Sequence, residues 1–179
     1  MEHYKFCPKC AGNLIKKKVN HSERLACEKC GFIFYQNPKP TVSIFVIDKG
    51  KILLGERTVE PYKGWWNPIG GFVEEGESLQ EAAEREDKEE AGVEIELLEM
   101  FGAGKDIYGD QHIIPVGFIG KLKRGVPQDQ EGEDVVGWRW FELADLPENI
   151  AFETTRNALE FLSRRRRARS DLKTHEKKL

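Results

Sequence analysis

The sequence lacks long apolar runs and has little excess of charge of one sign. No stretch approaches the ~20 apolar residues of a transmembrane helix, and the N-terminal residues have no signal-peptide core. Hydrophobic residues make up 39% and charged residues 33% of the 179 residues, and the net charge is −3. We therefore expect a soluble cytoplasmic protein with no membrane partner, formed by one full domain plus a small module.

Cysteine is scarce and confined to the N-terminal segment. The four cysteines Cys7, Cys10, Cys27 and Cys30 have the spacing C-x2-C-x16-C-x2-C, which is typical of a zinc site. Two disulfides are the alternative, but nothing in the sequence indicates secretion. A site closed by four thiolates has no open position for water, so we expect structural Zn²⁺ in residues 1–36, which resemble a zinc ribbon.

Acidic residues are concentrated in one helix. Between Glu74 and Glu90 there are nine acidic and two basic residues. Ser78 is suited to cap the helix, Glu81 completes a capping box, and Gly92 is placed to end it. On a helical wheel one stripe starts apolar and then continues as three carboxylates; its members are Leu79, Ala82, Ala83, Glu86, Glu89 and Glu90.

Three carboxylates on the inward side of a helix repel each other and lose hydration. A hard divalent cation with oxygen ligands compensates for both, and Mg²⁺ takes carboxylates together with substrate phosphates. The alternative is an acidic helix whose charges all face water.

The same stretch fits the longer pattern G-x5-E-x7-R-E-U-x-E-E-x-G-U, where U is a bulky apolar residue. The matched residues are Gly71, Glu77, Arg85, Glu86, Glu89, Glu90, Gly92 and Val93. The pattern resembles the signature of the Nudix hydrolases, which cleave nucleoside diphosphates linked to another group. The resemblance implies an α/β (α+β) fold over about residues 40–165: a Nudix-type α/β/α sandwich with a mixed sheet, preceded by the zinc ribbon.

The resemblance also implies the roles of individual residues. Glu86, Glu89 and Glu90 hold Mg²⁺ or Mn²⁺, and Arg85 orients Glu77 and the catalytic carboxylates. Further metal ligands are the Gly70 carbonyl and a carboxylate from the loop 125–134, with Glu133 first and Glu131 second. For that loop, a solvated acidic segment is an equal alternative.

Three residues are candidates for binding substrate. Arg57 stands where Nudix domains often have a basic residue, and it either forms a local salt bridge or contacts phosphate. Trp66 matches the family's tryptophan before the double glycine and either stacks on adenine or packs in the core. Tyr108 lies in the loop 102–110, and loops are where substrate selection is commonly located.

Asp87 departs from the family pattern, which has an apolar residue at this position. Aspartate there brings a desolvation cost unless it finds a partner. Three explanations are open. Asp87 lies at the edge of the stripe and reaches water, the helix is locally loosened, or the activity differs from that of the relatives.

Several substrates fit the resemblance. ADP-ribose, cleaved to AMP and ribose 5-phosphate, is the first choice, with a weak expectation of a homodimer. NADH ranks lower because the stretch S-Q-P-W-P-F-P-x-S of NADH pyrophosphatases is absent, and dinucleotides or nucleoside triphosphates are further alternatives. The alternative from a different class of function is a non-catalytic module that binds nucleotides or RNA.

The C-terminal segment is basic. A final helix is expected from Phe152 to about Arg169, with Leu159, Phe161 and Leu162 facing inward. Between Arg164 and Leu179 there are eight Lys or Arg against two acids. The tail, residues 166–179, is either a frayed helix end in solvent or a contact for RNA or an anionic surface.

Overall fold

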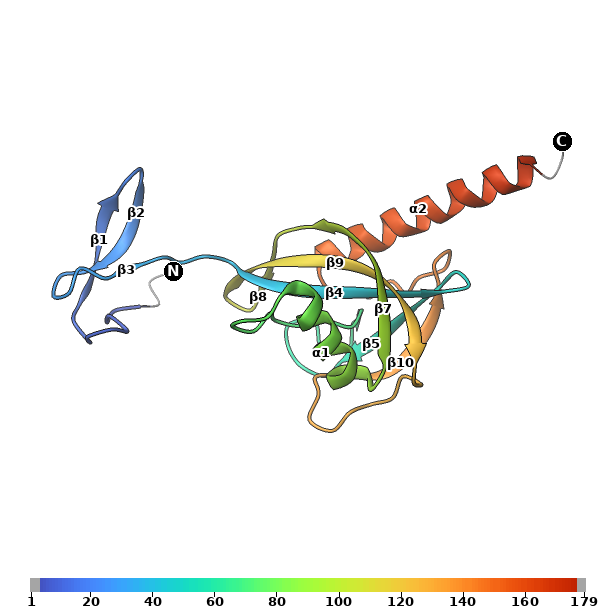
Figure 1. Cartoon of the computed structure of the whole chain (residues 1–179), viewed down its shortest axis with the longest axis horizontal. Helices are drawn as coiled ribbons and strands as arrows, with labels where there is room; N and C mark the ends of the chain where they lie inside the picture. Colours follow the sequence, from blue (N-terminus) through green and yellow to red (C-terminus); the bar gives the residue numbers. More distant parts are fainter. Residues whose placement is uncertain (1–3, 177–179) are drawn as a thin grey trace. The chain divides into compact units, whose positions relative to one another are not determined.

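The computed structural model describes the chain from residue 4 to residue 176, and its side chains from residue 4 to residue 166. The chain divides into two compact units, with the boundary between Asn37 and Pro38 (Figure 1). Most of the predicted basic tail, residues 167–179, lies outside the described side chains. None of the described helices has the length and apolar composition of a membrane-spanning segment.

The smaller unit is a three-stranded antiparallel sheet with the order β1-β2-β3. Within residues 4–37 only Cys7, Ala26 and Cys27 are buried. So small a core cannot hold the strands together by apolar burial alone. The strands are β1 (Leu14–Val19), β2 (Ser22–Cys27) and β3 (Ile33–Phe34).

The larger unit is built on a mixed sheet, as predicted. The strand order is β10-β5-β4-β9-β7; β4 and β9 are parallel, and the other neighbours are antiparallel. The short strands β6 and β8 pair with β5 and β9. The strands are β4 (Lys39–Asp48), β5 (Lys51–Arg57), β6 (Trp66–Asn67), β7 (Glu94–Ala103), β8 (Asp106–Tyr108), β9 (Gln111–Arg124) and β10 (Val135–Glu142).

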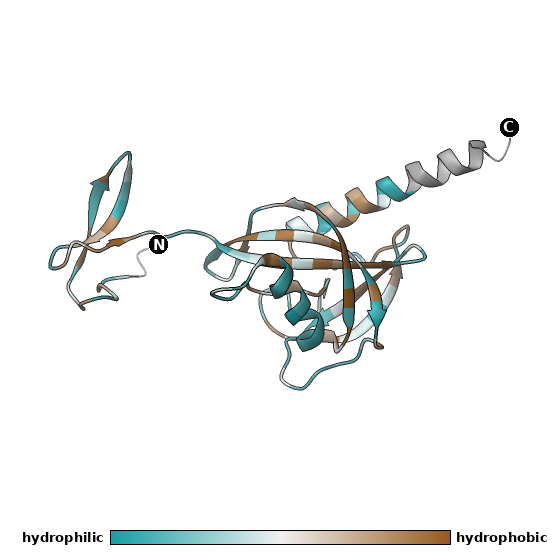
Figure 2. Ribbon diagram, viewed as in Figure 1, coloured by the Kyte–Doolittle hydropathy of each residue, from teal (hydrophilic) through white to brown (hydrophobic). Residues whose placement is uncertain are grey.

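The sheet is covered on both faces by helices, which confirms the predicted sandwich. Side chains alternate along β4, so Val42 and Ile44 belong to one core cluster and Phe45 to the other. Helix α1 (Leu79–Ala91) contributes Ala82 and Ala83 to the first cluster. Helix α2 (Glu153–Glu176) contributes Leu159 and Leu162 to the second. In Figure 2 the central strands are largely brown and α1 is mostly teal, because α1 buries only a narrow apolar stripe.

The C-terminal helix departs from the prediction in two ways. It begins at Glu153 and continues to Glu176, beyond the expected end near Arg169. Leu159 and Leu162 are buried as predicted, but Phe161 is 51% exposed. Positions 159 and 162 share one side of the helix, whereas Phe161 lies at the margin and stacks on Phe101 with ring centroids 6.2 Å apart.

The prediction of a loop over residues 102–110 was wrong. The segment predicted as the loop 102–110 contains β8, whose pairing partner lies in the adjoining strand β9. Pro115 does not break β9, because it takes part in a parallel ladder opposite Thr41 and its carbonyl accepts from the Gly104 N–H at 3.0 Å. The β8–β9 hairpin does have a local signal, the Gly109-Asp110 turn between Tyr108 and Gln111, which was missed. The pairing of Pro115 with Thr41 has none.

Candidate active site

Helix α1 begins and ends at the predicted residues. The Ser78 hydroxyl accepts from the Glu81 N–H at 3.2 Å, and the Glu81 carboxylate accepts from the Ser78 N–H at 2.8 Å. Gly92 ends the helix in the left-handed conformation with φ 64°. These caps fix the axis of α1 and therefore the direction in which its carboxylates point.

The glycine pair before α1 brings the backbone against both the sheet and the helix. A Cβ at Gly70 would lie 2.1 Å from the Val42 carbonyl oxygen, and a Cβ at Gly71 would lie 2.2 Å from Oε1 of Glu86. No larger residue fits at either position without moving backbone or a buried carboxylate.

Two carboxylates of α1 are buried beside this glycine pair. Glu90 is 6% exposed, and its Oε2 accepts from the Gly70 N–H at 2.9 Å; Glu86 is 8% exposed. Burial raises the pKa of both groups, that of Glu90 well above its ordinary value, and the nearby charge of Glu133 raises both further. The charge of Glu133, predicted from the loop 125–134, thus acts on both carboxylates. The Glu89 side chain is half exposed.

The donor set fits a hard divalent cation. Burial and mutual repulsion disfavour the charged forms of Glu86 and Glu90, and a bound cation would offset both costs. The carboxylate oxygens are spread out, because among the described residues only the four cysteines bring at least three ligand atoms within 4.8 Å of one another. A metal held here would thus have room for substrate oxygens between the side chains.

Arg85 connects the carboxylates to one another. Its Nε donates to Glu77 at 2.7 Å, and its Nη1 donates to Glu86 at 2.7 Å and to Glu89 at 2.8 Å. Its Nη2 donates to the Phe72 carbonyl at 2.8 Å, which ties the loop to the helix. The predicted orienting role of Arg85 requires such a network, and the hydrogen bond from Arg85 lowers the pKa of Glu77.

We expect Arg85→Met to lower turnover on the order of 10²-fold and to destabilise the fold by about 2 to 4 kcal/mol. The side chain is only 26% exposed, and its removal leaves several carboxylates without their donor. Steady-state kinetics and thermal denaturation measure the two effects. Lys88→Met removes the same charge from the exposed side of α1 and should leave turnover unchanged, with a loss of stability below about 1 kcal/mol. Equal effects in the two variants would contradict the orienting role.

Arg57 supplies the cationic side of the site. It is 6% exposed, its Nε donates to the Pro61 carbonyl at 2.8 Å, and its Nη2 is buried without a partner. Arg57 and Asn67 line a cavity of about 60 Å³ that also reaches Gly70 and Gly71. The Asn67 Oδ1 is buried and unpaired as well. Asn67 was missed from the sequence, although a polar side chain inside the apolar run 65–69 is a usable signal.

The two aromatic candidates have different surroundings. Tyr108 lines the Arg57 cavity and lies with its ring centroid 5.6 Å from the Arg57 guanidinium. Trp66 is 8% exposed and packs edge-on against Phe141 at 4.7 Å in the core beneath α2. This environment supports packing for Trp66 and a contact with substrate for Tyr108.

A larger groove adjoins this cavity on the α2 side of the sheet. It has a volume of about 330 Å³, and Phe101, Phe161 and Asn157 are among its lining residues. Ser43, Pro115, Thr154 and Thr155 line both spaces. The groove is mainly apolar, so the two spaces together offer a charged end and an apolar end.

Asp87 is not at a solvent-exposed edge, so that expectation was wrong. It is 1% exposed, within an unbroken α1, which also excludes a loosened helix. Burial raises its pKa to about 7, although the Ile95 backbone N–H donates to it, and its Oδ1 has no partner. A helical wheel of α1 could not reveal this environment, because Asp87 is covered by β7, the strand that follows the helix.

We expect Asp87→Asn to stabilise the protein at pH 8 and to have almost no effect near pH 4. The raised folded-state pKa means that stability falls as pH rises from about 4 to about 7, and an amide of the same shape removes this loss. The gain above pH 7 should be of the order of 2 to 4 kcal/mol. Denaturant unfolding across this pH range measures it, and a gain that is the same at every pH would contradict the explanation.

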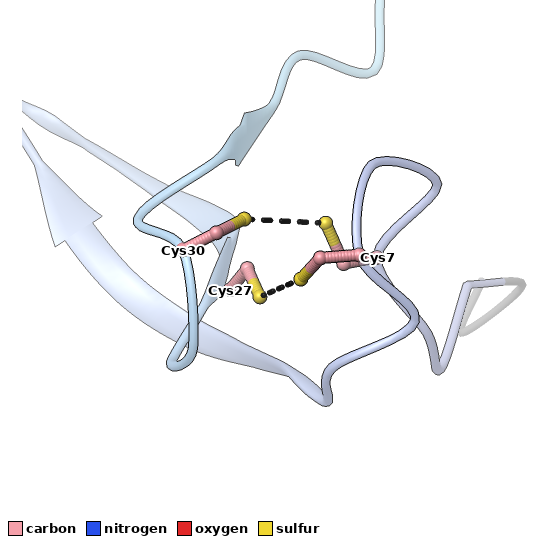
Figure 3. A group of neighbouring side chains, drawn as sticks. Cys7, Cys27 and Cys30 are labelled. Carbon is pink, nitrogen blue, oxygen red and sulfur yellow. Dashed lines mark hydrogen bonds between the residues drawn. The ribbon is translucent and has the colours of Figure 1, made fainter.

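The smaller unit contains the predicted zinc ligands (Figure 3). The Sγ atoms of Cys7 and Cys30 are 3.7 Å apart, and those of Cys10 and Cys27 are 3.5 Å apart. A tetrahedron of sulfurs ~2.3 Å from zinc has edges of about 3.8 Å, so the four thiols match such a site. Backbone N–H groups of Cys30 and Lys29 lower the pKa of the Cys27 thiol to about 7, which favours the thiolate that binds metal.

Family models match both units. A model described as "NUDIX domain" matches residues 37–162, and a model described as "Nudix N-terminal" matches residues 5–36. The chain belongs to the Nudix family. The predicted resemblance is thereby confirmed.

Individual Nudix proteins are similar to the chain. The "NAD-capped RNA hydrolase NudC" of Pseudomonas aeruginosa is 32% identical over 147 residues, covering 81% of this chain and 50% of the relative. The chain thus spans about half the length of the curated relatives it matches. A crystal structure of a Nudix hydrolase from Nitrosomonas europaea superimposes with a TM-score of 0.81 at 30% identity, covering 92% of this chain and 93% of that one. A MutT Nudix hydrolase from Burkholderia pseudomallei gives a TM-score of 0.65 at 28% identity, covering 69% of this chain and 97% of that one.

Proposed function

We propose that the chain is a divalent-metal-dependent hydrolase that cleaves the pyrophosphate of a nucleoside diphosphate linked to another group. The observation that carries the proposal is the meeting of two buried charges of opposite sign at one glycine pair. Glu90 bonds to Gly70, and Arg57 lines the cavity at the same glycines with an unpaired N–H. A pyrophosphate bound with a divalent cation satisfies both charges.

The metal ligands we propose are Glu86, Glu89, Glu90, Glu133 and the Gly70 carbonyl, with Mg²⁺ or Mn²⁺ as the ion. Such an ion supplies a more acidic water and neutralises charge that develops on the phosphates. The protein's own residues hold the reactants. Arg57 contacts a phosphate oxygen, and Arg85 with Glu77 keeps the carboxylates in position. One of the carboxylates receives the proton of the attacking water through a hydrogen bond.

The nucleoside part of the substrate fits the apolar groove beside the cavity. Tyr108 lies at the charged end, and Phe101 with Phe161 forms an aromatic wall at the apolar end. An adenosine linked through a pyrophosphate spans both ends, since a nucleobase needs an apolar slot with few polar groups.

Two ADP-linked substrates are favoured. ADP-ribose remains the first choice from the sequence resemblance. An NAD-type substrate is the second, because relatives 32% identical to this chain are named for hydrolysing NAD-capped RNA. Both contain the same adenosine diphosphate, so the site's charged end treats them alike, and the group beyond the second phosphate decides between them.

A substrate panel tests the proposal. The zinc-loaded protein is incubated with Mg²⁺ and ADP-ribose, NADH, dinucleoside polyphosphates, nucleoside triphosphates or an NAD-capped oligonucleotide, and products are separated by chromatography. AMP with ribose 5-phosphate identifies ADP-ribose hydrolysis, whereas a nicotinamide mononucleotide product identifies the NAD-type activity. The absence of turnover on every compound, with folded protein and metal present, would contradict the proposal and favour the non-catalytic binding module.

A further inference from the structure

The smaller unit carries a charge opposite to that of the whole chain. Residues 4–36 contain seven Lys or Arg against two Glu, although the complete chain has a net charge of −3. Four thiolates and one Zn²⁺ together contribute only two negative charges, so an excess of positive charge remains. Such a segment attracts polyanions.

Part of this charge lies on one face of the small sheet beside an exposed aromatic ring. Lys17 and Arg24 are directly opposite each other in the β1–β2 ladder, so their side chains share a face. The Arg24 guanidinium lies 4.7 Å from the centroid of the Tyr35 ring, which places Tyr35 on the same face. Ile15, two residues before Lys17, extends this face toward the cysteines. We call these four residues the ribbon face.

The aromatic and apolar members of the ribbon face are not used for packing. Tyr35 is 53% exposed and Ile15 is 42% exposed, whereas the buried residues of this unit are Cys7, Ala26 and Cys27. The half-exposed Tyr35 ring contacts the Arg24 guanidinium, and Lys17 lies opposite Arg24. Together they offer a stacking surface and phosphate contacts on one face. Single-stranded nucleic acids are recognised by this combination, and every base can use it because every base has an aromatic face.

The arginine run of α2 is less suited to such a ligand. Arg164 pairs with Glu160, Arg165 donates twice to Glu99 at 2.9 Å, and Arg166 donates to the Gly50 carbonyl at 2.8 Å. These three side chains are thus engaged within the chain, and the Arg167 side chain lies outside the described residues. The ribbon face has no acidic residue among its members.

We propose that the ribbon face binds single-stranded nucleic acid, with Tyr35 stacking on a base and Lys17 and Arg24 contacting phosphates. The proposal stands independently of the hydrolase activity, because none of these residues belongs to the carboxylate site. It gives the smaller unit a ligand of its own: a strand of unpaired nucleotides, either RNA or DNA.

Fluorescence anisotropy with a labelled single strand of about 15 nucleotides tests the proposal on the full zinc-loaded chain. We expect Tyr35→Ala to weaken binding about 5- to 100-fold. Lys17→Ala combined with Arg24→Ala should reduce the slope of log K against log salt by about 1.4, the value for two lost phosphate contacts. Lys18→Ala is the matched control, because it removes the same charge from the opposite face of β1 and should change the affinity little.

Further measurements separate this proposal from the alternatives. Zinc content and hydrolysis of the small-molecule substrate should be unchanged in all variants, so that a loss of binding is not a loss of folding or catalysis. RNA and DNA strands of one sequence identify the source of the ligand, and the duplex should compete poorly because its bases are stacked. Equal binding of duplex, no binding by the wild-type chain, or equal losses in Lys18→Ala and Tyr35→Ala would each overturn the proposal. So would a change in oligomeric state, rather than in strand binding, in Tyr35→Ala.

Discussion

Glu90→Gln should lower turnover on the order of 10³-fold or more while leaving the fold intact. The substitution preserves the shape of the side chain and an oxygen that can accept from the Gly70 N–H, a bond of 2.9 Å. It removes the charge that holds metal, and metal-dependent charge stabilisation is worth several kcal/mol in the transition state. Steady-state kinetics with saturating Mg²⁺ measures the loss.

Stability provides a second readout for the same variant. Burial raises the pKa of Glu90 well above its ordinary value, so the charged carboxylate destabilises the metal-free protein. Glu90→Gln should therefore melt at the same or a higher temperature in the presence of a chelator. Glu84→Gln, which neutralises an exposed carboxylate on the other side of α1, is the control and should retain full turnover. Undiminished activity in Glu90→Gln would show that the carboxylates of α1 are not the catalytic site.

Removal of zinc should unfold the smaller unit and leave the larger one folded. Within residues 4–37 the buried side chains are Cys7, Ala26 and Cys27, so the metal replaces a hydrophobic core. Structural zinc contributes about 10–16 kcal/mol to the folding of comparably small domains, which is more than this sheet could supply. Cys7→Ser or a strong chelator should therefore expose residues 4–36 to protease, while the fragment from residue 38 onward resists cleavage.

Metal analysis completes this test. The wild-type chain should contain one zinc ion, and Cys7→Ser should lose it. Lys9→Ala, an exposed position in the same knuckle, should retain it. A smaller unit that stays protease-resistant without zinc would show that the thiols form no structural metal site.

The elements that could be predicted are those with local signals. The capping box at Ser78 and the left-handed Gly92 define α1, and the alternation of Val42, Ile44 and Val46 defines a buried strand. The candidate active-site residues come from the same stretch, because residues three or four positions apart share a face of the helix, as Glu86 does with Glu89 and Glu90.

What the sequence did not reveal depends on contacts between distant segments. The parallel pairing of β4 with β9 joins residues more than 70 positions apart, and it places Pro115 within a ladder. Asp87 is buried because β7 returns over α1 and brings the Ile95 N–H to it. The unpaired Nη2 of Arg57 likewise results from aromatic residues, Tyr108 and Phe152, that converge from two other parts of the chain.

Titration with Mn²⁺, followed by the loss of the free-ion signal in electron paramagnetic resonance, tests most directly that the carboxylates beside Gly70 hold the catalytic metal. The zinc-loaded wild-type chain and Glu84→Gln should bind Mn²⁺ with equal affinity, and the double variant Glu86→Gln with Glu90→Gln should bind it at least tenfold more weakly. Addition of the substrate identified in the panel should tighten binding only in the first two. Equal Mn²⁺ binding by all three proteins would show that the buried carboxylates of α1 are not the metal site.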